Sequence, residues 1–317
     1  MNKEKTLETI NHFFNVQSKT SDRCLEPNEN CGQKAIRSHS IPSGSILDRL
    51  SKDGHVIMPS MKLKYPPPSE IEFKKVGINK ATTFSGLCSN HDREIFRPID
   101  IELPDANNTE HMFLLAYRAV LREYHACLQN GLRFQSTYQK RVDVGISPKD
   151  GPDDFGLYAT SHLINAFECY LYKRQFDQYL LDSDWAKLQH HIIILEDQPT
   201  TVAVSSLFSL DDIEAPETPR VNLSIYPTDK DLVVVFSSIE TDATYVTNYL
   251  DRILNSKGHY QKYLLSKLIL QSCDNVALSP DYFDSFSEDK KNAIGQFFVD
   301  TISVTAEDYE NEHLYLF

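Results

Sequence analysis

Three cysteines and one histidine in polar surroundings constrain the fold of this chain more than any other feature. Cys24 and Cys31 enclose LEPNEN, and much later Cys88 and His91 stand with only two residues between them. Thiols without another role usually pack in apolar cores, whereas these lie among Asn, Gly and Ser. Structural zinc sites take four sulfur or nitrogen ligands, commonly as two close pairs. The pattern predicts one Zn²⁺ ion bound by these four residues; the alternative is a set of unpaired thiols in an irregular lobe.

The other three cysteines have apolar, helix-like neighbours. Cys127, Cys169 and Cys273 lie in YHACLQ, AFECYLY and LILQSCD, and we expect them to be core residues. The chain starts MNKEKTLETINHFF, without the apolar run of a secretory signal, and no segment is apolar enough for a membrane span. We therefore expect a soluble cytoplasmic protein with reduced thiols and no membrane partner.

Charge divides the chain into two unequal parts. Residues 1–100 carry 15 Lys and Arg against 12 Asp and Glu, a net charge of +3, while the rest carries 17 against 33, a net charge of −16. A chain of 317 residues also exceeds the usual size of one domain. We predict a zinc-binding lobe at residues 1–104 and an acidic α+β domain at 105–317. The alternative interpretation of the charge step is a well-solvated helical domain that is simply acidic.

The spacing of apolar residues indicates the elements of both parts. In the first part we expect helices at 4–16 and 43–54, and strands at 55–59 and 71–76. From residue 109 a long helix begins, and a second long helix at 156–181 is expected to bury Leu163, Phe167, Tyr170, Leu171 and Phe176 on one face.

Between residues 191 and 238 the apolar period drops to two and β-branched residues dominate, which predicts four short strands in an antiparallel meander. Three helices are expected afterwards, at 245–255, 258–273 and 287–300. The predicted fold class is α+β: a small zinc-stabilised N-terminal lobe followed by a helical domain with an inserted antiparallel sheet.

Two segments of the first part resemble the His-Me finger nucleases of the HNH type. SHSIP at 38–42 resembles the family's first motif, and LCSNHDREIF at 87–96 resembles its turn with metal ligands at the start of a helix. The resemblance implies that His39 is the general base that activates water. It also implies that Asp92 holds a catalytic divalent cation such as Mg²⁺, beside a structural Zn²⁺ on the four predicted ligands.

The function implied by this resemblance is that of a zinc-containing, HNH-like, metal-dependent endonuclease or a nucleic-acid-associated protein. Lys34, Arg37 and Arg93 would hold the backbone of DNA at the N-terminal lobe. The acidic domain would then recognise a protein partner or regulate the nuclease. The layout further implies a component of a bacterial antiviral defence system.

A second interpretation keeps the metal frame and omits catalysis. Ser38 stands where the family usually has Asp or His, and Asp92 stands where it usually has His. The alternative is therefore a treble-clef module in a non-catalytic, zinc-stabilised protein-interaction protein, in which His39 is a zinc ligand or an ordinary histidine. The pair His190–His191 is interpreted as ordinary strand residues, with a second metal site as the alternative. The chain has no GxxxxGK[ST], GxGxxG or GxSxG motif.

Overall fold

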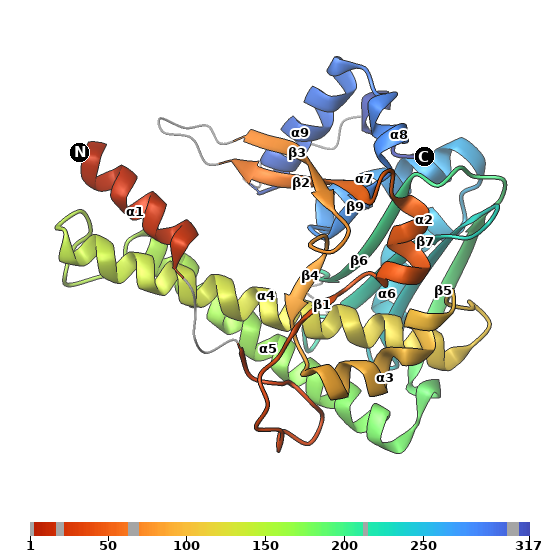
Figure 1. Ribbon diagram of the computed structural model, residues 1–317, viewed down its shortest axis with the longest axis horizontal. Coiled ribbons are helices and arrows are strands. Elements are labelled where there is room, and N and C mark those ends of the chain that lie inside the picture. Colours follow the sequence, from red (N-terminus) through yellow and green to blue (C-terminus); the bar gives the residue numbers. More distant parts are fainter. Residues whose placement is uncertain (1–2, 17–21, 63–69, 212–214, 303–310) are drawn as a thin grey trace. The chain divides into compact units, whose positions relative to one another are not determined.

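The chain folds into a mixed α/β structure with two compact units. The computed structural model describes residues 3–16, 22–62, 70–211, 215–302 and 311–317 (Figure 1). One unit comprises Met1–Ser38, Phe84–Glu94 and Val120–Ser183; the other comprises His39–Thr83, Ile95–Ala119 and Asp184–Phe317. Each unit takes residues from both sides of the expected boundary between 104 and 105. That boundary stays a prediction about which parts fold independently.

The first unit is built mainly from helices. It contains α1 (Lys3–Asn15), the first turns of α3 (Ser89–Ile101), the second part of α4 (Thr109–Asp143) and α5 (Asp154–Asp182). Phe13 of α1 packs on Phe134 of α4, with ring centroids 4.8 Å apart. The helices predicted at 4–16, from 109 onward and at 156–181 are confirmed in position, and α4 is 35 residues long. The helices predicted at 245–255, 258–273 and 287–300 are likewise confirmed, in the second unit.

Helix α5 buries a different face from the expected one. Phe176 is fully buried as predicted, but Phe167 and Leu171 are 61% and 50% exposed. The buried face instead uses small and polar residues as well as aromatic ones: Gly156, Ala159, Ala166, Cys169, Tyr172, Lys173, Phe176 and Asp177. Small residues let helices approach closely, and α5 packs through a face that contains several of them. The most apolar face of α5 is therefore not the one that is buried.

The second unit is organised around a seven-stranded antiparallel sheet with the strand order β3-β2-β9-β6-β7-β8-β5. Its strands are β2 (His55–Lys62), β3 (Glu70–Gly77), β5 (Leu188–Leu195), β6 (Val202–Ser209), β7 (Arg220–Pro227), β8 (Leu232–Ile239) and β9 (Val276–Leu278). The predicted meander is confirmed for β6, β7 and β8. It is wrong for β5, which pairs with β8 at the edge of the sheet, because β9 occupies the free side of β6.

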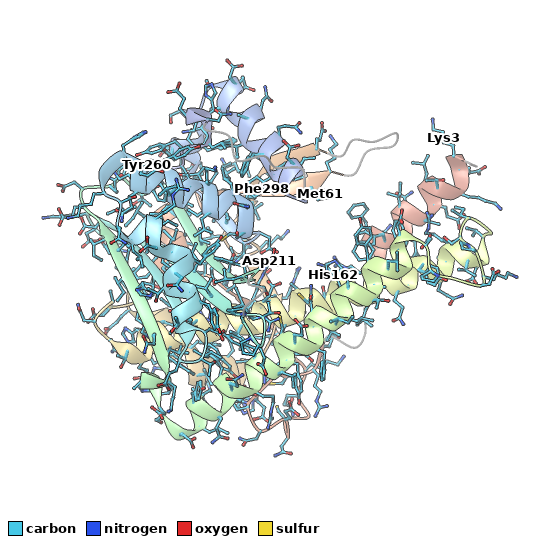
Figure 2. All side chains as sticks on the ribbon, turned by 180° about the vertical axis from the view of Figure 1, so that it is seen from behind. Lys3, Met61, His162, Asp211, Tyr260 and Phe298 are labelled. Atoms are coloured by element: carbon cyan, nitrogen blue, oxygen red, sulfur yellow. The ribbon has the colours of Figure 1, made fainter. Side chains whose placement is uncertain are left out.

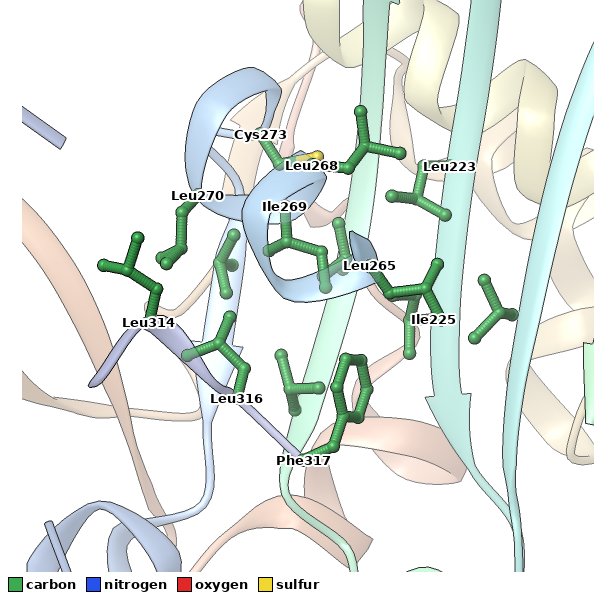
Figure 3. Packing of buried hydrophobic residues seen from close by; sticks show 14 of the residues in the cluster. Leu223, Ile225, Leu265, Leu268, Ile269, Leu270, Cys273, Leu314, Leu316 and Phe317 are labelled. Atoms are coloured by element: carbon green, nitrogen blue, oxygen red, sulfur yellow. The ribbon is translucent and has the colours of Figure 1, made fainter. Parts of the chain in front are cut away.

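The main core of the second unit lies between one face of this sheet and the C-terminal helices. These are α6 (Ala243–Leu254), α7 (Gly258–Ser272), α8 (Pro280–Asp284) and α9 (Glu288–Ile302). Alternate residues of each strand point to this face, as the period of two requires. Figure 3 shows Leu265 and Ile269 of α7 near Leu223 and Ile225 of the sheet, all almost completely buried. Leu316 of the C-terminal segment joins the same core.

The chain also contains several shorter helices and strands. The expected helix at 43–54 is a single π-helical turn, η2 (Ser43–Leu47), continued by α2 (Asp48–Leu50). Two short strands, β1 (Arg37–His39) and β4 (Thr83–Ser85), pair with each other. No described helix is both long and apolar enough to span a lipid bilayer.

Candidate metal centre

The four predicted ligands come together in the first unit. The Nδ1 atom of His91 lies 3.5 Å from Sγ of Cys24 and 3.4 Å from Sγ of Cys88, and the Sγ atoms of Cys31 and Cys88 are 3.9 Å apart. All four ligand atoms lie within 4.8 Å of one another. This group can hold a metal ion, and the described residues contain no second group of this kind.

Backbone hydrogen bonds hold the two ligand pairs side by side. The N–H of Leu25 donates to the carbonyl of Gly86 at 2.9 Å, and the N–H of Ile36 donates to the carbonyl of Leu87 at 2.8 Å. The segment that carries Cys24 and Cys31 is thus bonded directly to the residues just before Cys88. Chain segments distant in sequence meet here without a regular sheet.

Glu26 shapes the loop between the first two cysteines. Its buried carboxylate accepts hydrogen bonds from the backbone N–H groups of Asn28 at 2.9 Å, Asn30 at 2.5 Å and Cys31 at 3.1 Å. Burial raises the pKa of this carboxyl, but the three backbone donors outweigh burial and hold the pKa below its ordinary value. The six-residue gap is therefore closed by one charged side chain, which the sequence analysis did not single out.

A surface arginine braces the same loop from helix α5. Arg174 lies 3.6 Å from the carboxylate of Glu29 and donates to the carbonyl of Pro27 at 3.4 Å. Glu29 has a φ of 57°, a left-handed conformation that a tight turn requires here. Arg23 donates to the carbonyl of Glu29 at 2.8 Å. The loop is thus held on several sides by hydrogen bonds and an ion pair of the chain itself.

The second ligand pair lies at the start of helix α3. Cys88 directly precedes the helix, His91 lies in its first turn, and the N–H of Asp92 donates to the carbonyl of Cys88 at 2.9 Å. The unsatisfied N–H groups of a helix N-terminus stabilise a thiolate. Burial opposes ionisation of Cys88, but the N–H of His91 and the thiol of Cys24 bond to its sulfur and lower the pKa of Cys88.

Cys24 differs from Cys88 in the direction in which its surroundings shift its pKa. Cys24 is 2% exposed, and its sulfur accepts a hydrogen bond from the backbone N–H of Cys88 at 3.2 Å. Burial raises the pKa of Cys24 to about 12, so a proton stays on this sulfur at neutral pH until a cation replaces it. A metal ion that binds here must displace this proton.

His39 is not part of the metal group. It lies at the end of β1, and its Nε2 atom is 2.7 Å from the carbonyl oxygen of Ile78, so this nitrogen carries the proton and donates it. The alternative in which His39 is a zinc ligand therefore finds no support, since the group that can hold a metal consists of the other four residues. His39 belongs to the second compact unit, whereas Asp92, the other predicted catalytic residue, belongs to the first.

The remaining candidates have ordinary surroundings. Lys34, Arg37 and Arg93 are exposed. His190 and His191 lie on the edge strand β5 and contact hydroxyl groups of Ser237 and Thr247, at 2.8 Å and 3.0 Å. The three cysteines expected in the core are buried as predicted: Cys127, Cys169 and Cys273.

Comparison with known proteins gives no relative. No family model matches the chain, and neither a curated protein nor a solved structure does. The functional argument therefore rests on the residues themselves.

Proposed function

We propose that this protein binds one structural Zn²⁺ ion through Cys24, Cys31, Cys88 and His91, and that the ion stabilises a non-catalytic interaction module. The observation that carries the proposal is the spacing of the four ligand atoms. Zinc–sulfur bonds of about 2.3 Å and zinc–nitrogen bonds of about 2.0 Å at tetrahedral angles place sulfurs about 3.8 Å apart and sulfur and nitrogen about 3.5 Å apart. The distances of 3.9, 3.5 and 3.4 Å agree with these values.

The composition of the ligand set supports a structural role. Three thiolates and one imidazole complete the tetrahedral shell of zinc, whereas catalytic zinc keeps a position for water or substrate. The same soft donors disfavour Mg²⁺ and Ca²⁺, which prefer oxygen. An ion that joins the segment around Cys24 to the start of α3 closes a long loop, and its binding energy becomes folding energy of the first unit.

The metal content of the purified full-length protein tests the zinc site. We expect about one zinc per chain by elemental analysis, lost in Cys88→Ser and in His91→Ala. Cys127→Ala removes a buried thiol outside the group and should keep the zinc. Zinc-free wild-type protein that is as heat-stable as the zinc-loaded form would overturn the structural role, and full zinc content in Cys88→Ser would overturn the ligand assignment.

A second candidate function, the metal-dependent nuclease, is favoured by the state of His39. With its Nε2–H given to the carbonyl of Ile78, the ring keeps the lone pair of Nδ1, which is the atom that a general base needs. The exposed cations Lys34, Arg37 and Arg93 are suited to contacts with phosphates. We therefore propose His39 as the base and Asp92 as the cation ligand in this alternative.

A plasmid-nicking assay separates the two functions. Wild-type protein, His39→Ala and Asp92→Ala are incubated with Mg²⁺, Mn²⁺ or Ni²⁺, with His55→Ala as a control that removes a histidine bonded to the carbonyl of Asp53. Nicking by the wild type and His55→Ala alone would support the nuclease. Equal inactivity of all four proteins with every cation would exclude it and leave the interaction module.

A further inference from the structure

Helix α5 carries a stripe of exposed apolar side chains. Leu157, Ile164 and Leu171 follow one another at intervals of seven residues and are 58%, 54% and 50% exposed; Phe167, between the last two, is 61% exposed. Seven residues are about two helical turns, so these four side chains share one face. We call this set the α5 stripe. In Figure 2, α5 is the helix that carries the labelled His162.

Apolar exposure is concentrated on this helix. Six of the fifteen large apolar side chains that are exposed among the described residues belong to α5, so the stripe is more than scattered surface leucine. Between residues 157 and 171 the helix has one carboxylate, Glu168, and no Lys or Arg. Low charge with large apolar groups is the composition of an interface centre. The face is expected to have a partner.

We infer that the partner is a second copy of the same helix, antiparallel to the first and related to it by a twofold axis near Ile164. In such a pair, residues at equal distances before and after Ile164 face each other across the axis. Leu157, seven residues before, then faces Leu171, seven residues after, and Ile164 faces its own copy. The apolar residues of the stripe thus cover each other.

The charges at the ends of the stripe fit the same arrangement. Asp154 lies ten residues before Ile164 and Arg174 ten residues after it, so each exposed carboxylate faces an exposed guanidinium of the second copy. Arg174 already holds Glu29 and Pro27, but a guanidinium has five N–H donors and its side chain remains 48% exposed. Opposite charges at both ends favour the antiparallel over the parallel pair.

Size complementarity adds a third match. Phe167, the most exposed residue of the stripe, lies three residues after Ile164, and Ser161 lies three residues before it. A large side chain therefore faces a small one on the second copy, as interdigitating helices require. The stripe extends over about 21 Å of helix, which is short for a standard interface, so we expect a weak dimer with a dissociation constant in the micromolar range.

This inference rests on the proposed interaction role and names its partner, but it uses none of the four metal ligands. The test is sedimentation velocity of the full-length protein at a series of micromolar concentrations, with zinc content measured on the same samples. The wild type is expected to pass from monomer to dimer. Ile164→Lys places two like charges on the axis and should weaken the dimer about tenfold or more.

A charge exchange tests the antiparallel orientation. Asp154→Arg and Arg174→Asp should each weaken the dimer about threefold to tenfold, because like charges then meet at both ends, and the double variant should recover the wild-type affinity. Oxidation of Ile164→Cys should give a disulfide-linked dimer, since this position faces itself. Leu181, on the same helix, is 49% exposed, but no α5 residue of the second copy would face it in this arrangement. Leu181→Cys should therefore remain unlinked.

The outcomes separate the two levels of the proposal. A wild-type protein that is monomeric throughout, with Ile164→Cys unlinked, overturns the dimer even when zinc is present. Dimerisation that persists in Ile164→Lys assigns it to another surface and overturns the stripe. Wild-type protein that forms the dimer but is purified without zinc overturns only the proposed metal role.

Discussion

The carboxylate of Glu26 accepts the backbone N–H of Cys31 at 3.1 Å, so a residue between two metal ligands sets the position of the second. Two further N–H groups of the same loop, from Asn28 and Asn30, donate to this carboxylate. A charge buried to 4% exposure is stable there because the backbone donors satisfy it. The loop is therefore preorganised for the proposed ion, which would lower the entropy cost of binding.

Substitution of Glu26 should weaken the proposed zinc binding without removing a ligand. Glu26→Gln keeps the shape of the side chain but replaces a charged acceptor by a single amide oxygen, leaving at least one buried N–H without a partner. Loss of an outer contact of this kind typically costs about tenfold to a hundredfold in metal affinity. Competition with a chromophoric zinc chelator measures the change.

Glu29→Gln is the matched control for this loop. Glu29 contacts Arg174 at 3.6 Å through a 40% exposed side chain, and such a surface pair contributes little. Its zinc affinity should stay within about twofold of the wild type. Equal weakening in both variants would show that negative charge near the site, rather than the Glu26 hydrogen bonds, determines affinity.

The metal group could be predicted from sequence because its ligands are chemically conspicuous. Cys88 and His91 have a spacing typical of zinc ligands, and all three cysteines of the group stand in segments with no apolar pattern. Glu26 could not be predicted in the same way, since an acidic residue in a polar loop is common. The only signal for Glu26 was its position in the six-residue gap between Cys24 and Cys31. The backbone N–H groups of so wide a gap need hydrogen-bond acceptors, and a carboxylate can supply them.

The fold was predictable where interactions are local and unpredictable where they are not. Helices such as α6 and α7 follow from apolar spacing alone. The place of β5 depends on β9, a strand of three residues that pairs with β6 and β2, and so short a strand has no sequence period. For α5 the prediction of the buried face was wrong, because the helix packs through small residues and leaves its apolar stripe exposed.

The N-cap of α5 should be a measurable source of stability. The carboxylate of Asp153 accepts the N–H of Gly156 at 3.1 Å and a hydrogen bond from Arg141 at 2.7 Å, and it also contacts Ser147. Asp153→Asn should lower the free energy of unfolding at neutral pH by about 1–2 kcal/mol. Denaturant unfolding measures it, with the exposed Asp150→Asn as the control.

The pH dependence of this contribution has a definite sign. Burial raises the pKa of Asp153, but the bonds from Ser147, Arg141 and Gly156 outweigh it and leave the pKa below its ordinary value. A carboxyl with a lowered folded-state pKa stabilises fully above its unfolded pKa of about 3.9, and the contribution is lost as pH falls through the folded value. The difference in stability between wild type and Asp153→Asn should therefore shrink below about pH 4. A difference that grew on acidification would contradict the assignment.

A buried ion pair in α5 should behave non-additively. Lys173 and Asp177 are 1% and 2% exposed and lie 2.7 Å apart, one turn from each other. Asp177→Leu or Lys173→Met leaves an uncompensated charge in the core and should cost about 3–5 kcal/mol, while the double variant Lys173→Met/Asp177→Leu should cost much less than the sum. Additive losses in a double-mutant cycle, measured by urea unfolding, would show that the pair is not coupled.

Replacement of Arg118 by lysine should lower the stability of the protein. Its guanidinium, 2% exposed, makes two parallel bonds of 2.7 and 2.8 Å to Asp100 and lies 4.0 Å from the ring centroid of Phe96. Lysine cannot make both bonds or stack on the ring, so Arg118→Lys should cost about 2–4 kcal/mol. Arg49→Lys, at an exposed pair with Asp229, should stay within about 1 kcal/mol of the wild type. Thermal unfolding of the two variants side by side measures the loss of stability in each. Similar small losses would mean that positive charge alone suffices at residue 118. A large loss confined to Arg118→Lys would assign the stability to the planar geometry of the guanidinium.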